Sequence, residues 1–487
     1  MSNGNRVFSN VIWRLAERFG AQFVAFIVSI ILARLLTPED YGTIALVTVF
    51  TTLLNVFVDS GFGTALIQKK DADDLDFSSV FYFNIVICIF LFAVMCIFAP
   101  LIADYYNRTD LTPVIRVLSF TLVISGVKNV QQAYVSRHMM FKKFFFATLG
   151  GTIGAAILGI TLAYLGFGVW ALVAQQLFNA SVDTIVLWVT VRWRPKRCFS
   201  ITRLKTLFSF GWRLLVSGLI STAYMDLRQL IIGKMYSSTD LAFYNQGDRI
   251  PKFIANNINA SIDSVLLPAM SDAQDDCEHV KNMTRRSIKV SIYILAPIMT
   301  GLAVISDKIV LLILTEKWLP CVPYMFVFCG TLMFYPIHTC NLNAIKAMGR
   351  SDLFLKLEII KSIIGIAVIL CSMNISVWAI CVSGILTSIL SQIVNAYPNK
   401  KLLNYGYREQ ISDIIPTLLL ACFMGAVVFI VGKIELNIII SLIIQVFLGA
   451  SIYIIGSKVL NLDSYEYVRN IVISIVNKKN NSFLKRG

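Results

Sequence analysis

Apolar stretches of about 20 residues recur along almost the whole chain, and short polar or charged segments separate them. A helix of about 20 residues spans the hydrocarbon core of a bilayer. Lipid offers no hydrogen-bond partner for the backbone, so helices are the default spanning structure. Of the 487 residues, 57% are hydrophobic and only 15% are charged, too few charges to cover a soluble domain of this size. We therefore predict an all-α integral membrane protein.

The apolar stretches and the turn residues between them predict 14 transmembrane helices. Two of the turns are Thr37-Pro38-Glu39-Asp40 and Ser237-Ser238-Thr239-Asp240, whose residue types are typical of turns. The predicted helices cover residues 11–33, 41–66, 78–102, 113–135, 145–165, 168–191, 207–233, 240–268, 287–315, 321–346, 353–373, 376–397, 411–432 and 436–457.

The start of the chain recurs at an offset of 199 to 200 residues. Trp13-Arg14-Leu15 returns as Trp212-Arg213-Leu214, and Asp40 returns as Asp240. Six helices per repeat is an even number, so both halves enter the membrane in the same direction, as in transporters built from parallel repeats. We predict two six-helix lobes around a central cavity, plus two extra C-terminal helices. The predicted parts are an N-terminal lobe (1–191), a basic cytoplasmic linker (192–206), a C-terminal lobe (207–397), the two extra helices (398–460) and a cytoplasmic tail (461–487).

The distribution of lysine and arginine predicts the orientation of the chain. With the N-terminus in the cytoplasm, the inner segments carry 28 basic residues and the outer segments carry 7. Cytoplasmic loops typically hold such an excess, so we expect both termini in the cytoplasm. The net charge of +15 then needs no nucleic acid as a partner. The longest basic run, Arg192 to Lys205, is either a topological anchor or a site for anionic lipid or a substrate phosphate.

Ionisable residues inside the predicted membrane helices are the candidate functional residues, because a charge there is costly unless it faces protein or water. We interpret them as lining a hydrated, net cationic cavity between the lobes, where arginine forks suit a phosphate or pyrophosphate. Two alternatives stay open: Arg14 and Arg18 as interfacial anchors, and Asp226 with Arg228 as a structural pair. The substrate-binding candidates are Arg14, Arg18, Lys128, Arg213, Arg228 and Lys361, and the ion-coupling candidates are Glu17, Asp183 and Asp226.

Several motifs of enzymes and metal sites are missing from the sequence. It has no GxxxxGK[ST] phosphate loop, so we expect no ATP hydrolysis. His138, His279 and His338 lie far apart, and the ten cysteines include no CxxC pair, so we expect neither a metal nor a cofactor. No outer loop is long enough for an extracytoplasmic catalytic domain. We predict no catalytic residues and a protein that is not an enzyme.

Three segments resemble a known group of membrane proteins. They are LARLLTPEDYGTIALVTVF followed by DSGFGTALIQ, the run Phe243-Tyr244-Asn245, and LLPAMSDAQDD. The chain is similar over nearly its whole length to the polysaccharide exporters of the multidrug/oligosaccharidyl-lipid/polysaccharide (MOP) superfamily. These exporters include the O-antigen and colanic-acid type flippases.

The resemblance implies two lobes that rock between inward-open and outward-open states. It implies a polyprenyl-pyrophosphate-linked oligosaccharide as substrate, destined for lipopolysaccharide O-antigen or exopolysaccharide. Cationic residues on the first and seventh helices of the family match Arg14, Arg18, Arg213 and Arg228 by helix placement. The last two predicted helices resemble the pair that forms a groove for the lipid tail in the lipid II flippase branch.

These observations lead to one main hypothesis and two alternatives. We predict a flippase in the bacterial inner membrane that works by alternating access and couples to an H⁺ or Na⁺ gradient. Its expected partners are the lipid-linked oligosaccharide, membrane lipids, a polysaccharide polymerase and a chain-length regulator. The alternatives are a multidrug cation antiporter of the same superfamily and a non-transporting scaffold of a polysaccharide assembly complex.

Overall fold

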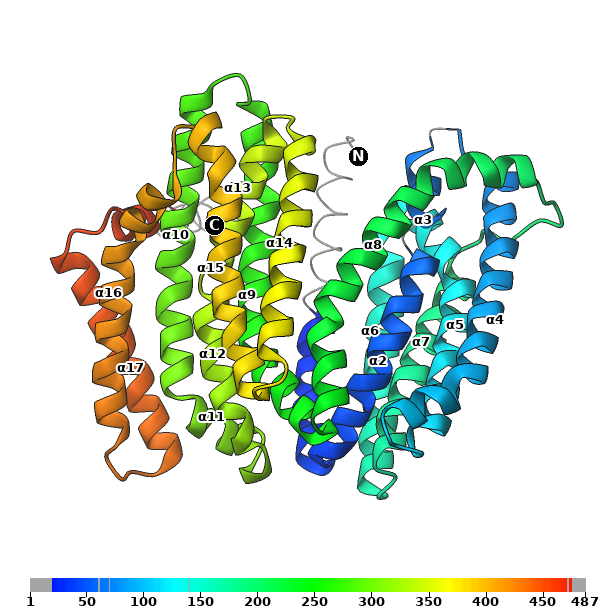
Figure 1. The fold of residues 1–487 in the computed structure, drawn as a ribbon, viewed down its shortest axis with the longest axis horizontal. Coiled ribbons are helices and arrows are strands. Elements are labelled where there is room, and N and C mark those ends of the chain that lie inside the picture. The colour runs from blue at the N-terminus through cyan, green and yellow to red at the C-terminus, as the bar shows by residue number, and fades with distance from the viewer. Residues whose placement is uncertain (1–19, 60–61, 70, 139, 471–472, 475–487) are drawn as a thin grey trace, which may run out of the picture. The chain divides into compact units, whose positions relative to one another are not determined.

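The computed structural model describes residues 20–59, 62–69, 71–138, 140–470 and 473–474 (Figure 1). These residues form helices joined by short turns, and no strand occurs among them. Nine helical segments within these ranges are long and apolar enough to cross a membrane. The prediction of an all-α, multi-pass membrane protein is therefore confirmed.

Among the described residues each predicted membrane helix coincides with helical residues, but the stretches 287–315 and 321–346 are each divided into two helices. The stretch 321–346, for example, is divided between α12 (Val322–Leu332) and α13 (Tyr335–Ala347). Pro336 stands at the second position of α13, where its missing N–H is harmless, whereas inside a continuous helix it would break a hydrogen bond. The number of membrane crossings stays a prediction.

The chain divides into two compact units, residues 1–242 and residues 243–487. The helices of the first unit follow the apolar helix Gly20–Leu35. They are α2 (Pro38–Asp59), α3 (Phe62–Gln68), α4 (Asp74–Tyr105), α5 (Leu111–Arg137), α6 (Phe141–Tyr164), α7 (Val169–Thr190) and α8 (Ile201–Met235). Within this unit α4 packs on α5, α6 packs on α7, and α2 packs on both α5 and α8.

The second unit begins inside α9 (Ser238–Asp272), and its next helix, α10 (Cys277–Val304), packs on α12 and α13. It continues with α11 (Ser306–Ile313), the 3₁₀ helix η1 (Glu316–Cys321), α12, α13, α14 (Ser351–Ser372), α15 (Val377–Leu402), α16 (Tyr407–Gly432) and α17 (Ile438–Val459). The division of the lobes at residues 192–206 stays a prediction; α8, which follows that linker, packs on α2, α3 and α4.

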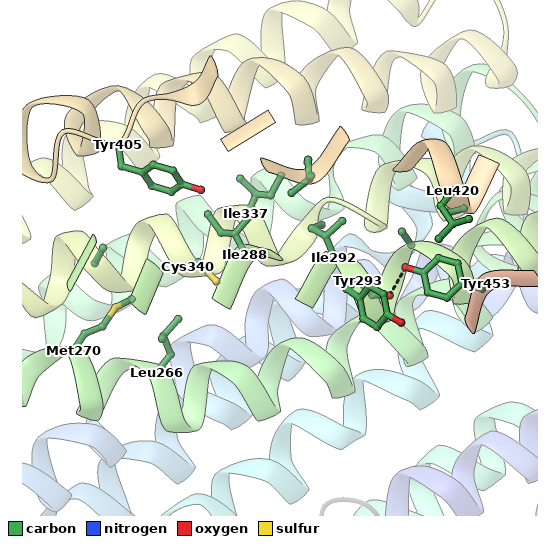
Figure 2. Close-up of a cluster of buried hydrophobic side chains, with 14 of the residues drawn as sticks. Leu266, Met270, Ile288, Ile292, Tyr293, Ile337, Cys340, Tyr405, Leu420 and Tyr453 are labelled. Atoms are coloured by element: carbon green, nitrogen blue, oxygen red, sulfur yellow. Dashed lines mark hydrogen bonds between the residues drawn. The ribbon is translucent and has the colours of Figure 1, made fainter. Parts of the chain in front are cut away.

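Helices α16 and α17, the predicted extra pair, share a buried core with α10 (Figure 2). The hydroxyl of Tyr453 on α17 donates to the carbonyl oxygen of Tyr293 on α10 at 2.8 Å. The hydroxyl of Tyr293 donates in turn to Ser457 Oγ at 3.1 Å. Both tyrosine rings are buried, so their hydroxyls need these partners. These two hydrogen bonds hold α17 against α10.

The two turns of the internal repeat make the same hydrogen bonds. Asp40 Oδ2 accepts from Thr37 N at 3.0 Å and from Thr37 Oγ1 at 2.7 Å, and Asp40 N donates to Thr37 Oγ1. Asp240 Oδ2 accepts from Ser237 N at 3.2 Å and from Ser237 Oγ at 2.6 Å, and Asp240 N donates to Ser237 Oγ. These pairs satisfy backbone donors at the starts of α2 and α9. The repeat predicted from the sequence thus extends to local structure.

The two repeat-related turns also touch each other in the first unit. A Cβ atom added at Gly42 of α2 would lie 1.8 Å from the carbonyl oxygen of Ser238. Arg108, in the α4–α5 loop, donates to Ser238 Oγ at 2.5 Å and to Thr43 Oγ1 at 3.1 Å. Its Nε also donates to Asp110 at 2.9 Å. We call Gly42, Thr43, Arg108, Asp110 and Ser238 the turn cluster.

Candidate functional site

Three long helices of the described structure, α8, α9 and α14, are neither among the nine apolar spans nor among the shorter apolar helices. Each carries charged or amide side chains along its length, such as Asp226 and Arg228 on α8 and Lys361 on α14. Polar residues on spanning helices are rare and mark sites of function. The candidate functional residues therefore lie on these helices and at the charged positions of α5 and α7.

An ion pair joins α5 to α7. Lys128 Nζ donates to Asp183 Oδ2 at 3.0 Å, and the two side chains are only 21% and 13% exposed. The other carboxylate oxygen of Asp183 is buried and has no hydrogen-bond partner among the described residues. Trp188, one turn further along α7, donates to the carbonyl oxygen of Val127 at 3.2 Å and fixes the same helix pair. The sequence predicted both charges but not that they pair.

Helix α6 packs closely against α7 beside this ion pair. A Cβ atom added at Gly151 of α6 would lie 2.9 Å from Asn179 Oδ1 and 3.4 Å from the backbone nitrogen of Asp183. The missing side chain at Gly151 therefore lets α6 approach α7 at the level of the acid. Removing one partner of a buried pair leaves an uncompensated charge, which costs about 3–5 kcal/mol. A proton or ion that reaches Asp183 must compete with Lys128.

A second ion pair lies on α14 in the second unit. Lys361 Nζ is 2.6 Å from Glu358 Oε1, one helical turn away, and the lysine side chain is 13% exposed. On the neighbouring helices α13 and α15, the ring of His338 is hydrogen-bonded to Asn395 Nδ2 at 3.0 Å. Glu358 was missed in the sequence, although its spacing of three residues from Lys361 is visible there.

The remaining predicted residues fall into two groups. Asp226 and Arg228 are half-buried on α8, and Asp226 Oδ1 accepts from Gln229 Nε2 at 3.0 Å. Arg213 belongs to α8, but its side chain lies outside the described structure, and Arg14, Glu17 and Arg18 lie outside the described residues. The described structure therefore brings Lys128 and Asp183 into contact, and it describes Asp226, Arg228 and Lys361 separately. Their roles stay predictions.

The basic run from Arg192 to Lys205 is partly engaged within the protein. Lys196 Nζ is 2.6 Å from Asp74 Oδ2, and Arg203 lies 3.7 Å from the buried Asp76. The backbone nitrogens of Lys196 and Ser200 donate to serine hydroxyls of α4 at 2.9 Å. These contacts bind the linker to the start of α4, which is the structural role of an anchor.

An apolar cavity of about 450 Å³ opens between α10, α16 and α17. Gly301 of α10 and Gly449 of α17 line it together with Met424, Val428 and Val446. A Cβ atom added at Gly301 would meet nothing nearer than 4.0 Å, so the glycine leaves room. The cavity is lined mainly by carbon and can hold a hydrocarbon chain.

Comparison with known proteins identifies relatives in polysaccharide biosynthesis. Residues 31–323, more than half of the chain, match the family model described as "Polysaccharide biosynthesis protein". The succinoglycan biosynthesis transport protein ExoT of Rhizobium meliloti is 25% identical over 317 residues, which are 65% of this chain and 64% of that protein. The teichuronic acid biosynthesis protein TuaB of Bacillus subtilis is 25% identical over 72% of each chain. The lipopolysaccharide biosynthesis protein WzxC of Escherichia coli is 24% identical over 82% of this chain and 83% of that protein.

Two solved structures share the fold. The lipid II flippase MurJ in an inward closed conformation matches with a TM-score of 0.77 at 14% identity, covering 95% of this chain and 100% of that chain. An inward-facing multidrug resistance MATE family transporter matches with a TM-score of 0.62 at 16% identity, covering 80% of this chain and 98% of that chain. We conclude that the chain belongs to the polysaccharide biosynthesis protein family and has the fold of transporters of the MOP superfamily.

Proposed function

We propose that the protein is a flippase and not an enzyme. It moves a polyprenyl-pyrophosphate-linked oligosaccharide from the inner to the outer leaflet of the bacterial inner membrane, for surface polysaccharide synthesis. The observation that carries the proposal is the family match over residues 31–323, with relatives named for succinoglycan transport, teichuronic acid and lipopolysaccharide biosynthesis. The multi-pass helical fold supports a transporter.

The buried cations are proposed to bind the charged part of the substrate. Pyrophosphate carries several negative charges, and lysine and arginine inside a low-dielectric bundle bind such a group strongly. Lys361 and Lys128 already have carboxylate partners. A substrate phosphate would therefore replace Glu358 or Asp183 as the partner, and the released carboxylate would then be available to a proton. Arg213 and Arg228 on α8 are the arginine candidates.

Charge reversal at Lys361 tests the proposal. Lys361→Glu places two acids one turn apart on α14, so we expect loss of surface polysaccharide in a deletion strain complemented with the variant, at unchanged protein abundance. Lys356→Glu is the matched control, because Lys356 is exposed on the same helix. Normal polymer with both variants would instead favour a scaffold. Drug resistance on overexpression would favour the multidrug antiporter.

Ion coupling is proposed to pass through the acids, first of all through Asp183. Moving an anion out of a negative interior releases roughly 2.3 kcal/mol per charge per 100 mV, so outward transport needs no ATP. An H⁺ or Na⁺ ion that binds Asp183, Asp226 or Glu17 would help return the empty carrier. Asp183→Asn should make flipping of a fluorescent lipid-linked oligosaccharide in proteoliposomes insensitive to the gradient that drives the wild type. Wild-type flipping that ignores ion gradients and voltage would contradict this scheme.

The apolar cavity between α10, α16 and α17 is proposed to hold part of the prenyl chain. Gly301→Leu would fill this cavity, whereas Gly384→Leu on α15 adds the same side chain where no atom lies within 4 Å of the new Cβ. We expect Gly301→Leu to slow flipping in proteoliposomes and Gly384→Leu to leave it unchanged. Equal rates for both variants would remove the cavity from the transport route.

The orientation and the assembly partners complete the proposal. Both termini are proposed to be cytoplasmic, and a polysaccharide polymerase and a chain-length regulator are the proposed protein partners. Labelling of single engineered cysteines with a membrane-impermeant reagent tests the orientation. A cysteine in place of the exposed Thr109 should react in intact spheroplasts, whereas one in place of the exposed Arg408 should react only after lysis.

A further inference from the structure

Two cavities adjoin at one end of the second unit, where α9, α10 and the helix of residues 463–470 meet. The first cavity, of about 530 Å³, is lined mainly by polar side chains: Asn282, Arg285, Arg286, Lys289, Asp463 and Ser464. The second, of about 550 Å³, is lined largely by apolar ones: Ile262, Val265, Leu266, Ala269 and Met283. Arg286, Val290 and Tyr467 line both. A basic and an apolar cavity therefore share a wall.

The helix of residues 463–470 forms one wall of the basic cavity. Asn461, with a φ of 49°, turns the chain back after α17, a conformation that asparagine tolerates better than most residues. Leu462, Tyr465 and Val468 then pack on the core of the second unit, to which Leu266 and Met270 of α9 also belong (Figure 2). This packing holds Tyr467 in the common wall of the two cavities.

One cation of the basic cavity, Arg286, is not part of an ion pair with the described residues. Arg285 is paired with Asp413 at 2.6 Å, and Lys289 is paired with Asp463 at 2.6 Å. The guanidinium of Arg286 lies 3.5 Å from the centre of the Tyr467 ring. It has no carboxylate partner among the residues that the structure describes. Arg285 and Lys289 are thus paired, and Arg286 is the cation of this cavity that can bind an anionic group.

The position of the cavities fits the boundary between membrane and water. The basic residues of α10 lie in its first four turns, and the rest of this helix, up to Val304, has no charged side chain. An occupant of both cavities would have an anionic group among the cations and a hydrocarbon chain against α9. A single cation outside an ion pair matches a singly charged phosphodiester better than a pyrophosphate, which carries two or more negative charges.

We propose that these joined cavities bind an anionic glycerophospholipid, with its phosphodiester at Arg286 and an acyl chain along Ile262, Val265 and Met283. The lipid would bridge α9, α10 and the C-terminal helix, and would stabilise their packing because it binds the folded protein only. This site is separate from the proposed transport route, and the proposal does not depend on the flippase function.

The test measures the apparent melting temperature of the full-length protein in neutral detergent as lipid is added. Dioleoylphosphatidylglycerol should raise it in a saturable way, and dioleoylphosphatidylcholine should not. Arg286→Ala should raise the half-saturating concentration about fivefold, equivalent to roughly 1 kcal/mol for one basic residue. Lys281→Ala, which removes a cation of α10 that lines neither cavity, should leave that concentration unchanged.

A second variant leaves every charge in place. Ala269→Phe should fill the apolar cavity and weaken the response to phosphatidylglycerol, while its melting temperature without lipid shows that it folds. Equal weakening by Arg286→Ala and Lys281→Ala would overturn the proposal in favour of general surface attraction. A response to farnesyl pyrophosphate but not to phosphatidylglycerol would also overturn it, and would assign the cavities to the pyrophosphate substrate instead. Inorganic pyrophosphate, tested alone, should have no effect.

Discussion

Substitution of Gly42 by alanine tests the contact between the two repeat-related turns. The added Cβ would lie 1.8 Å from the carbonyl oxygen of Ser238, whereas ordinary contact begins at 3.4 Å, so one turn must move by about 1.6 Å. A movement of that size would break the hydrogen bond from Arg108 to Ser238 Oγ, now 2.5 Å long. The clash is with backbone, which cannot rotate away as a side chain can.

The expected cost follows from these two losses. Overpacking costs about 1–3 kcal/mol, and a hydrogen bond to a charged group contributes about 1.5–3 kcal/mol. Alanine regains about 0.5–1 kcal/mol over glycine inside a helix. The net destabilisation of Gly42→Ala is therefore about 1.5–5.5 kcal/mol. At about 2–4 °C per kcal/mol for a unit of this size, the apparent melting temperature should fall by roughly 10 °C at the midpoints of these ranges.

The assay is fluorescence-detected size exclusion of heated protein in detergent. Gly150→Ala is the matched control, because Gly150 is also helical and no atom lies within 4 Å of its new Cβ. This control should be as stable as the wild type or slightly more so. Gly42→Ala combined with Ser238→Gly should stay destabilised, because the clash involves the carbonyl oxygen. A wild-type melting temperature for Gly42→Ala would refute the contact.

Three further predictions concern other bonds. Lys128→Met and Asp183→Asn should each lower the melting temperature. Lys128→Met should lower the free energy of unfolding by about 3–5 kcal/mol, because it leaves the charge of Asp183 buried without its partner. The double variant should lose less stability than the sum of the two single variants, and additive losses would contradict the pairing. Tyr453→Phe should cost about 1 kcal/mol by removing one hydrogen bond, measured as a lower melting temperature. The hydrogen bond from Arg108 holds the pKa of Asp110 below its usual range. The pair therefore stabilises the protein at any pH above the ordinary aspartate pKa of about 3.9. This stabilisation is lost as the pH falls from there through the lowered pKa of Asp110. The difference in melting temperature between the wild type and Asp110→Asn should therefore be present at pH 7 and shrink as the pH falls below about 3.9, and a constant difference would count against the pair.

Local patterns in the sequence predicted much of the fold. Apolar runs placed the helices, and the repeated turn placed Asp40 and Asp240 at corresponding helix starts, where both make the same bonds. The break between α12 and α13 was missed although Pro336 signals it, because the apolar run continues across the proline. The position of a helix along the chain depends on residues that are close in sequence, so it can be predicted from the sequence.

The candidate site was predicted less completely, because its contacts join distant residues. Lys128 and Asp183 are 55 positions apart, and only the packing of α5 on α7 brings them together. The partner of Lys196, Asp74, is on α4, so the sequence left the basic run open as either a topological anchor or a site for anionic lipid or phosphate. Glu358 is different, since its spacing from Lys361 could have been read directly. Charge identity is therefore predictable, whereas charge pairing depends on tertiary structure.

The same hydrogen bonds recur at Thr37 and at Ser237. A substitution in one turn can therefore be compared with the same substitution in the other turn of the same protein. The same lesion, such as Asp40→Asn or Asp240→Asn, can be made in either copy, and detergent, expression level and lipid then affect both variants alike. Any difference in phenotype measures how unequally the two turns contribute to the stability and activity of the protein. Selection after duplication would be expected to leave such an inequality, and a pair of single substitutions is enough to observe it.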